Sequence, residues 1–191
     1  MSRHGFEIKT NEQIVLMRAA GLATAAALRE VRKAIRPGVS TLELDAIAEA
    51  TIKSHGGHSN FQLVPGYHHT ICSSVNDEVV HGIPTQARVL RAGDIVSIDC
   101  GAEIGEWNGD SAMTVIVPNS TDDVADPELV ARRQHLSDVT EHSLWVGIAA
   151  LSKADHLNDV GIAIEEYIYS QKNHLGKDFG ILEDYVGHGI G

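Results

Sequence analysis

The segment from Asp94 to Val117, DIVSIDCGAEIGEWNGDSAMTVIV, constrains the fold more than any other part of the chain. Apolar residues alternate with small or polar ones on both sides of a central glycine, a pattern typical of a β-hairpin. A two-residue loop at Ile104-Gly105 would place Asp99 directly opposite Asp110. The alternation then predicts two faces. One carries Ile98, Cys100, Met113 and Val115, and the other carries Ser97, Asp99, Asp110, Ala112 and Thr114.

The two aspartates are the strongest chemical signal in this hairpin. Residues directly opposite each other have Cβ atoms about 4.5–5.5 Å apart. At that separation two carboxylates near a partly buried site repel by roughly 3–4 kcal/mol. Either one carboxyl group is protonated or a cation bridges the pair, and a divalent metal is the simpler explanation. Two alternatives stay open: a bulge at Gly105 that sends Asp99 and Asp110 to opposite faces, or a solvated pair at a strand edge.

Two histidines are candidates for the same site. His81 begins the turn His81-Gly82-Ile83-Pro84, and His188 lies in the glycine-rich stretch Gly187-His188-Gly189-Ile190-Gly191. Glycines on both sides of a histidine let backbone and bulky groups approach it closely. A surface turn histidine and a structural hydrogen-bond donor remain the alternatives for these two residues.

Composition narrows the classes of function. The 191 residues include 15 Lys and Arg against 26 Asp and Glu, a net charge of −11, which disfavours binding to nucleic acid or anionic lipid. The two cysteines, Cys72 and Cys100, cannot form a disulfide framework and are expected to be small buried hydrophobes. No signal-peptide pattern occurs in the first residues, so a cytoplasmic protein is expected.

The remaining sequence predicts helices around this central hairpin. Capping boxes at Thr10 and Ser40 indicate helices near 10–35 and 40–55, and Asp126-Pro127 starts a third. A fourth helix is expected near 157–171 and a strand near 181–186. The first helix should bury Ile14, Met17, Gly21, Ala25, Leu28, Val31 and Ile35. The third should bury Leu129, Leu136, Val139, Leu144 and Ile148. Helices packed on a central antiparallel or mixed sheet make this an α+β fold.

Five stretches occur in a fixed order: IKTNEQIVLMRAAG, RPGVSTLELD, ICSSVNDEVVHGIP, GDIVSIDCGAEIGEWNGDSAMTV and GHGIG. Together they resemble the type I methionine aminopeptidases of bacterial type, over nearly the whole chain. The resemblance implies the α+β pita-bread fold, whose two halves are related by a pseudo-twofold axis around a dinuclear metal centre.

The resemblance also implies a role for each candidate residue. Asp99 would bind one metal, Asp110 would bridge both metals, and His188 would ligate one of them. His81 would contact the scissile peptide group, and Cys72 and Tyr67 would form walls of the methionine pocket. The implied activity is removal of the initiator methionine by a metal-activated hydroxide, with a small second residue preferred.

The implied cofactors are two divalent metal ions of the Co, Mn, Fe or Zn type. The implied partners are the N-terminal peptides of nascent chains, with a position near the ribosome and no direct contact with nucleic acid or membrane. A monomer is expected for the full-length protein.

Two features depart from the family pattern. The pocket rim from Val64 to His69 differs from the usual one, and the family continues beyond G-H-G-I-G with a further histidine and two glutamate ligands. We therefore expect residues 1–191 to form a single metallo-aminopeptidase domain that lacks the C-terminal part of the fold. Three ligands would hold one metal weakly, so this chain alone is expected to be weakly active or inactive. The alternatives are a Xaa-Pro-type peptidase and a non-catalytic pita-bread binding module.

Overall fold

The structure is a computed structural model that describes residues 8–182, 185 and 187–190. The chain forms two compact units, one of Met1–Asp123 with Ile190–Gly191 and the other of Val124–Gly189. Within the described residues, every helix is too short or too polar to cross a membrane. That residues 1–191 act as one enzyme domain stays a prediction.

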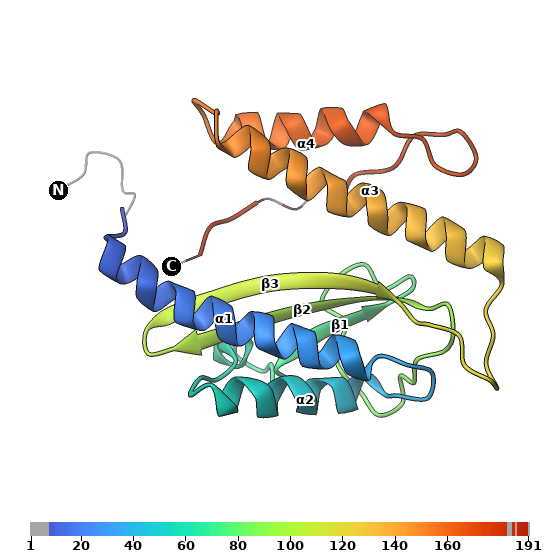
Figure 1. Ribbon diagram of the computed structural model, residues 1–191, viewed down its shortest axis with the longest axis horizontal. Helices are drawn as coiled ribbons and strands as arrows, with labels where there is room; N and C mark the ends of the chain where they lie inside the picture. Colours follow the sequence, from blue (N-terminus) through green and yellow to red (C-terminus); the bar gives the residue numbers. More distant parts are fainter. Residues whose placement is uncertain (1–7, 183–184, 186, 191) are drawn as a thin grey trace. The chain divides into compact units, whose positions relative to one another are not determined.

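The first unit is a three-stranded antiparallel sheet covered on one face by two helices (Figure 1). The strands are β1 (Ile71–Val75), β2 (Ile95–Ile104) and β3 (Trp107–Ile116), in the order β1-β2-β3. The helices are α1 (Asn11–Ala34) and α2 (Thr41–Ser54), and a short 3-10 helix, η1 (Asn60–Leu63), precedes β1.

Both helices begin where the capping boxes predict. The Thr10 hydroxyl accepts a hydrogen bond from the Gln13 N–H (3.3 Å), and the Gln13 side chain accepts one from the Thr10 N–H (2.7 Å). The Ser40 hydroxyl accepts from the Glu43 N–H at 3.2 Å in the same way at the start of α2. These reciprocal bonds satisfy N–H groups that the first helical turn leaves without a partner.

The hairpin register corrects one prediction. Ile104 pairs with Trp107, so the turn is Gly105-Glu106, and Asp99 pairs with Ala112 while Asp110 pairs with Gly101. The prediction that Asp99 lies directly opposite Asp110 is wrong, because each aspartate pairs two residues away from the other. The first loop position has a positive φ of 64°, which glycine adopts without strain and a β-branched isoleucine does not. Because the shift is an even number of residues, the predicted faces are confirmed, and both aspartates share a face.

The face of the sheet toward the helices forms the core. Its strand residues are Ile71, Val75, Val96, Ile98, Cys100 and Ala102, packed with Ala23, Ala27 and Val31 of α1 and Leu44, Ala48 and Ile52 of α2. The predicted apolar face of α1 is only partly correct, because Ile14 is 52% exposed while Ala20 is fully buried. A Cβ on Gly109 would lie 2.6 Å from the Ala20 carbonyl, so the close approach of the helix backbone to β3 requires glycine at 109.

The second unit contains the helices α3 (Pro127–Leu151) and α4 (Asn158–Ser170), close to their predicted ranges. Asp126 caps α3 as predicted, since its side chain accepts from the Glu128 N–H at 2.9 Å. The helices pack closely at Gly147, where a Cβ would lie 2.8 Å from Ile164 Cδ1.

Two predictions in this unit fail or lie partly outside the described residues. On α3 the predicted burial of Val139 is confirmed, but the other buried residues are Ser143 and Gly147. Leu136, Leu144 and Ile148 of the predicted face are about half exposed. The tight contact at Gly147 turns that line of small residues toward α4. No strand forms at 181, 182 or 185 of the predicted strand 181–186, and residues 183, 184 and 186 lie outside the described part.

Candidate active site

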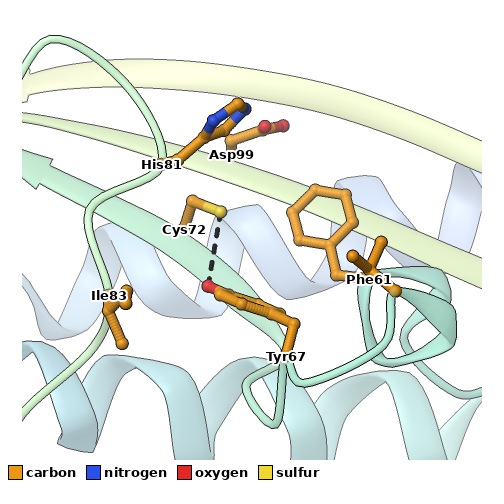
Figure 2. Close-up of a pocket in the computed structure, with 7 residues that line it drawn as sticks. Phe61, Tyr67, Cys72, His81, Ile83 and Asp99 are labelled. Atoms are coloured by element: carbon orange, nitrogen blue, oxygen red, sulfur yellow. Dashed lines mark hydrogen bonds between the residues drawn. The ribbon is translucent and has the colours of Figure 1, made fainter.

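A pocket of about 450 Å³ lies on the face of the sheet opposite the helical core. Its walls are formed by Phe61, Val64, Tyr67, Cys72, His81, Ile83 and Asp99. Figure 2 shows His81 and Asp99 close together on one side, with Tyr67, Cys72 and Phe61 around the remainder. The loop before β1, the strands β1 and β2, and the turn at 81–83 therefore contribute to one cavity.

Strand pairing places the first two polar groups of this pocket. Cys72 pairs with Asp99, so both side chains leave the same face of the sheet. The Tyr67 hydroxyl donates to the Ile71 carbonyl at 2.6 Å and lies 3.3 Å from Cys72 Sγ (Figure 2). Burial raises the pKa of the Cys72 thiol, and the nearby Asp99 carboxylate raises it further. Burial also raises the pKa of Tyr67, so this wall is uncharged at neutral pH and suits an apolar side chain.

His81 reaches the pocket because the turn that carries it is fixed against β1. The Ser73 N–H donates to the Gly82 carbonyl at 2.8 Å, and the Gly82 N–H donates to the Ser74 hydroxyl at 3.1 Å. A Cβ on Gly82 would lie 2.3 Å from the Ser73 carbonyl oxygen, so only glycine fits there. His81 itself has a positive φ of 56°, a strained conformation of the kind that concentrates at functional sites.

Asp99 and Asp110 lie on the pocket face of neighbouring strands, displaced by two residues along the strand direction. Such diagonal neighbours are separated by roughly 7–8 Å between their Cα atoms, which lowers the expected repulsion to about 2 kcal/mol. Both residues are half-buried. Two carboxylates on one face of neighbouring strands supply hard oxygen donors, so this pair fits a divalent cation.

The structure does not assemble a complete metal centre from the residues it describes. Within residues 8–182, 185 and 187–190 there is no group of three or more His, Cys, Asp or Glu side chains that could hold a metal ion. His188 belongs to the second unit, is exposed, and has its Nδ1 atom 3.1 Å from the Gly189 carbonyl oxygen. Its role as a metal ligand therefore stays a prediction.

Four of the predicted site residues, Tyr67, Cys72, His81 and Asp99, line one pocket, and Asp110 lies on the same face of the sheet. Phe61, Val64 and Ile83 also line the pocket, and the sequence patterns did not predict them as site residues. Ile83 lies two residues after His81 in the same turn motif, so the motif could have predicted Ile83 as a pocket residue. Phe61 and Val64 lie in a segment without periodicity, so nothing local indicates which way their side chains point.

The fold and these residues define a class of metallopeptidase. Residues 15–191 match the model of metallopeptidase family M24, and the chain belongs to that family. Within the family it is similar to methionine aminopeptidases. It is 47% identical to methionine aminopeptidase 1 of Mycobacterium tuberculosis (strain CDC 1551 / Oshkosh) over 92% of the chain, and it spans 62% of that protein's length.

Solved structures agree with this placement. The methionine aminopeptidase of Thermotoga maritima superimposes with a TM-score of 0.80 at 37% identity, covering 96% of this chain and 68% of that one. Aminopeptidase PepP of Pseudomonas aeruginosa gives a TM-score of 0.68 at 19% identity, covering 85% of this chain and 34% of that one, and shares the fold alone. The predicted resemblance and the α+β pita-bread fold are thereby confirmed, and the Xaa-Pro alternative is not favoured.

Proposed function

We propose that this protein removes the N-terminal methionine from peptides, acting as a metalloaminopeptidase on newly made chains. The observation that carries the proposal is the pocket in which Tyr67, Cys72, His81 and Asp99 meet. The similarity to methionine aminopeptidases over 92% of the chain supports the same activity.

The pocket supports methionine as the bound residue. Phe61 and Tyr67 contact each other edge-on, with ring centroids 6.4 Å apart, and Val64 and Ile83 add aliphatic surface. A thioether packs favourably against aromatic rings, with the sulfur about 5 Å from the ring. The neutral Cys72 thiol and Tyr67 hydroxyl leave no charge on this wall. We infer that the methionine side chain occupies the cavity and that a small second residue follows it.

Asp99 and Asp110 are the residues of this unit that would hold metal, and His188 is the third proposed ligand. When bound, divalent metal ions lower the pKa of water and polarise a carbonyl group, which is the chemistry that peptide hydrolysis requires. We propose two ions of the Co, Mn, Fe or Zn type, which Asp99, Asp110 and His188 would help to hold.

His81 supplies a group that can hold or deliver a proton. Its ring faces the same pocket as Asp99 (Figure 2), and the fixed turn at Gly82 holds its backbone in place. We propose that the imidazole binds the scissile peptide group and orients or protonates the leaving amine. The proposed setting is the cytoplasm near the ribosome, without direct contact with nucleic acid or membrane, and the proposed state is a monomer.

The test combines turnover with a binding readout. The protein is incubated with Met-Ala-Ser and with an Ala-Pro peptide in the presence of Co²⁺, Mn²⁺, Fe²⁺ or Zn²⁺, and free amino acids are measured by mass spectrometry. Metal-dependent release of methionine that exceeds release in Asp99→Asn supports the proposal. Release no greater than in Asp99→Asn, or preferred cleavage before proline, contradicts it.

Protection of Cys72 gives a readout that needs no turnover. Because Cys72 lines the pocket, millimolar L-methionine should slow its alkylation by iodoacetamide, whereas L-aspartate should leave the rate unchanged. Equal rates with both amino acids would contradict the assignment of this pocket to the methionine side chain.

A further inference from the structure

Behind the pocket wall lies a side-chain pair that the proposed function does not use. Asp45 of α2 is only 8% exposed, although aspartate is seldom buried unless it is paired. Its Oδ1 atom accepts from the Thr70 N–H at 2.7 Å and the Ile71 N–H at 3.0 Å. Its Oδ2 atom lies 3.2 Å from Nδ1 of His69. One carboxylate thus connects the helix to the backbone entering β1 and to an imidazole ring.

The imidazole in turn contacts the pocket wall. The rings of His69 and Tyr67 meet edge-to-face, with centroids 5.8 Å apart and an interplanar angle of 69°. On its other flank Tyr67 contacts Phe61, and its hydroxyl bonds to Ile71 and approaches Cys72. The Tyr67 ring is therefore bounded by aromatic neighbours, and one of these is held by a buried carboxylate.

We propose that the Asp45–His69 pair is a positioning device that holds the Tyr67 ring over Cys72 and so sets the width of the substrate pocket. This proposal rests on the proposed function only where it calls the cavity a substrate pocket. His69 and Asp45 do not line the cavity and act through Tyr67. The loop 64–69 has no regular secondary structure, so Tyr67 needs such an anchor to keep one orientation.

The physical reason lies in the two oxygens of one carboxylate. Oδ1 takes two backbone N–H groups that precede and begin β1, which fixes the end of the loop. Oδ2 lies 3.2 Å from Nδ1 of His69, within hydrogen-bonding distance, and so restrains the ring. The two restraints converge on the residues flanking Tyr67, so loss of either widens the range of positions that its ring can occupy.

The test measures how well Tyr67 covers the Cys72 thiol. His69→Ala removes both the ring contact and the bond to Asp45, and His69→Phe keeps an aromatic ring but loses the bond. We expect each variant to raise the rate of Cys72 alkylation by iodoacetamide about fivefold, the factor for one lost hydrogen bond. His68→Ala is the matched control, because His68 is the exposed neighbour in the same loop, and it should react like the wild type.

Cys100 serves as an internal control for loosening of the whole fold. It is fully buried on the core face, so a specific effect on Tyr67 leaves its alkylation unchanged, as read by peptide mapping. A wild-type rate in His69→Phe, or a parallel rise at Cys100, overturns the proposal. Where the wild type releases methionine, both His69 variants should also raise KM about fivefold at unchanged kcat. If it releases none, the proposed function fails, and the Cys72 rates still decide this inference.

Discussion

The two faces of the three-stranded sheet are built from alternate residues of the same strands, yet they carry different properties. The core face presents the fully buried residues Val96, Ile98 and Cys100 to the two helices. The pocket face presents half-exposed Ser97 and Asp99 on the same strand. Because successive side chains of a strand point to opposite faces, one strand can stabilise the core with one set of residues and form the site with the other. Substitutions at neighbouring positions should separate the two.

The largest expected change in stability is on the core face. Ile98→Ala removes a fully buried side chain, and we expect it to lower the free energy of unfolding by about 2–5 kcal/mol. The neighbouring Asp99→Asn should change it by less than about 1 kcal/mol in the metal-free protein, because it keeps the shape and removes one charge near Asp110. Urea unfolding followed by circular dichroism measures both. Equal losses in the two variants would show that the faces are not separable.

A second comparison concerns two glycines at the contact between α1 and β3. Gly109→Ala would place a Cβ 2.6 Å from the Ala20 carbonyl, and we expect a loss of about 1–3 kcal/mol as the helix is displaced. Gly21→Ala in α1 meets no atom within 4 Å and should stabilise the protein by up to about 1 kcal/mol through helix propensity. Thermal unfolding should show a lower midpoint temperature for Gly109→Ala and a higher one for Gly21→Ala than for the wild type. A neutral Gly109→Ala would mean that α1 is not closely seated on β3.

The smallest expected effect is a pH dependence of the core cysteine. Burial raises the pKa of the Cys100 thiol to about 12, above the value of 9.0 for an exposed thiol. Between pH 9 and 12 the folded state therefore keeps a thiol proton that the unfolded chain loses. The contribution of the buried Cys100 thiol to the free energy of unfolding is complete below pH 9 and is lost as the pH rises from 9 to 12. Between pH 9 and 10 the advantage of the wild type over Cys100→Ala should shrink by about 1 kcal/mol. Urea unfolding at both pH values measures the difference, and a constant advantage would contradict it.

Local signals in the sequence predicted local structure well. The capping boxes at Thr10 and Ser40 predicted the helix starts, because the bonds involved span only three residues. The division of the hairpin into two faces also survived the error in register. A shift of two residues moves each partner along the strand without turning it over. The position of the loop itself depended on the φ of Gly105, which periodicity does not reveal.

Signals that depend on long-range packing were missed. The backbone of α1 at Ala20 approaches β3 at Gly109, which is far away in sequence, and Ala20 is buried there while Ile14 is exposed. The pocket residues Phe61 and Val64 come from an irregular loop. The anchor at Asp45 is 24 residues from His69. Sequence patterns predict such residues only when they lie next to a recognisable motif, such as the turn that contains His81.

The most direct test of the account is the metal content of the purified protein with and without Asp110. After equilibrium dialysis against Mn²⁺ or Co²⁺, elemental analysis should find metal above the buffer level with the wild type and with Asp122→Ala, whose carboxylate is exposed and distant in sequence from the pair. Asp110→Ala should retain at most one tenth of that metal, the loss expected when a ligand is removed. Equal metal in Asp110→Ala and the wild type would remove the aspartate pair from the site and contradict the account.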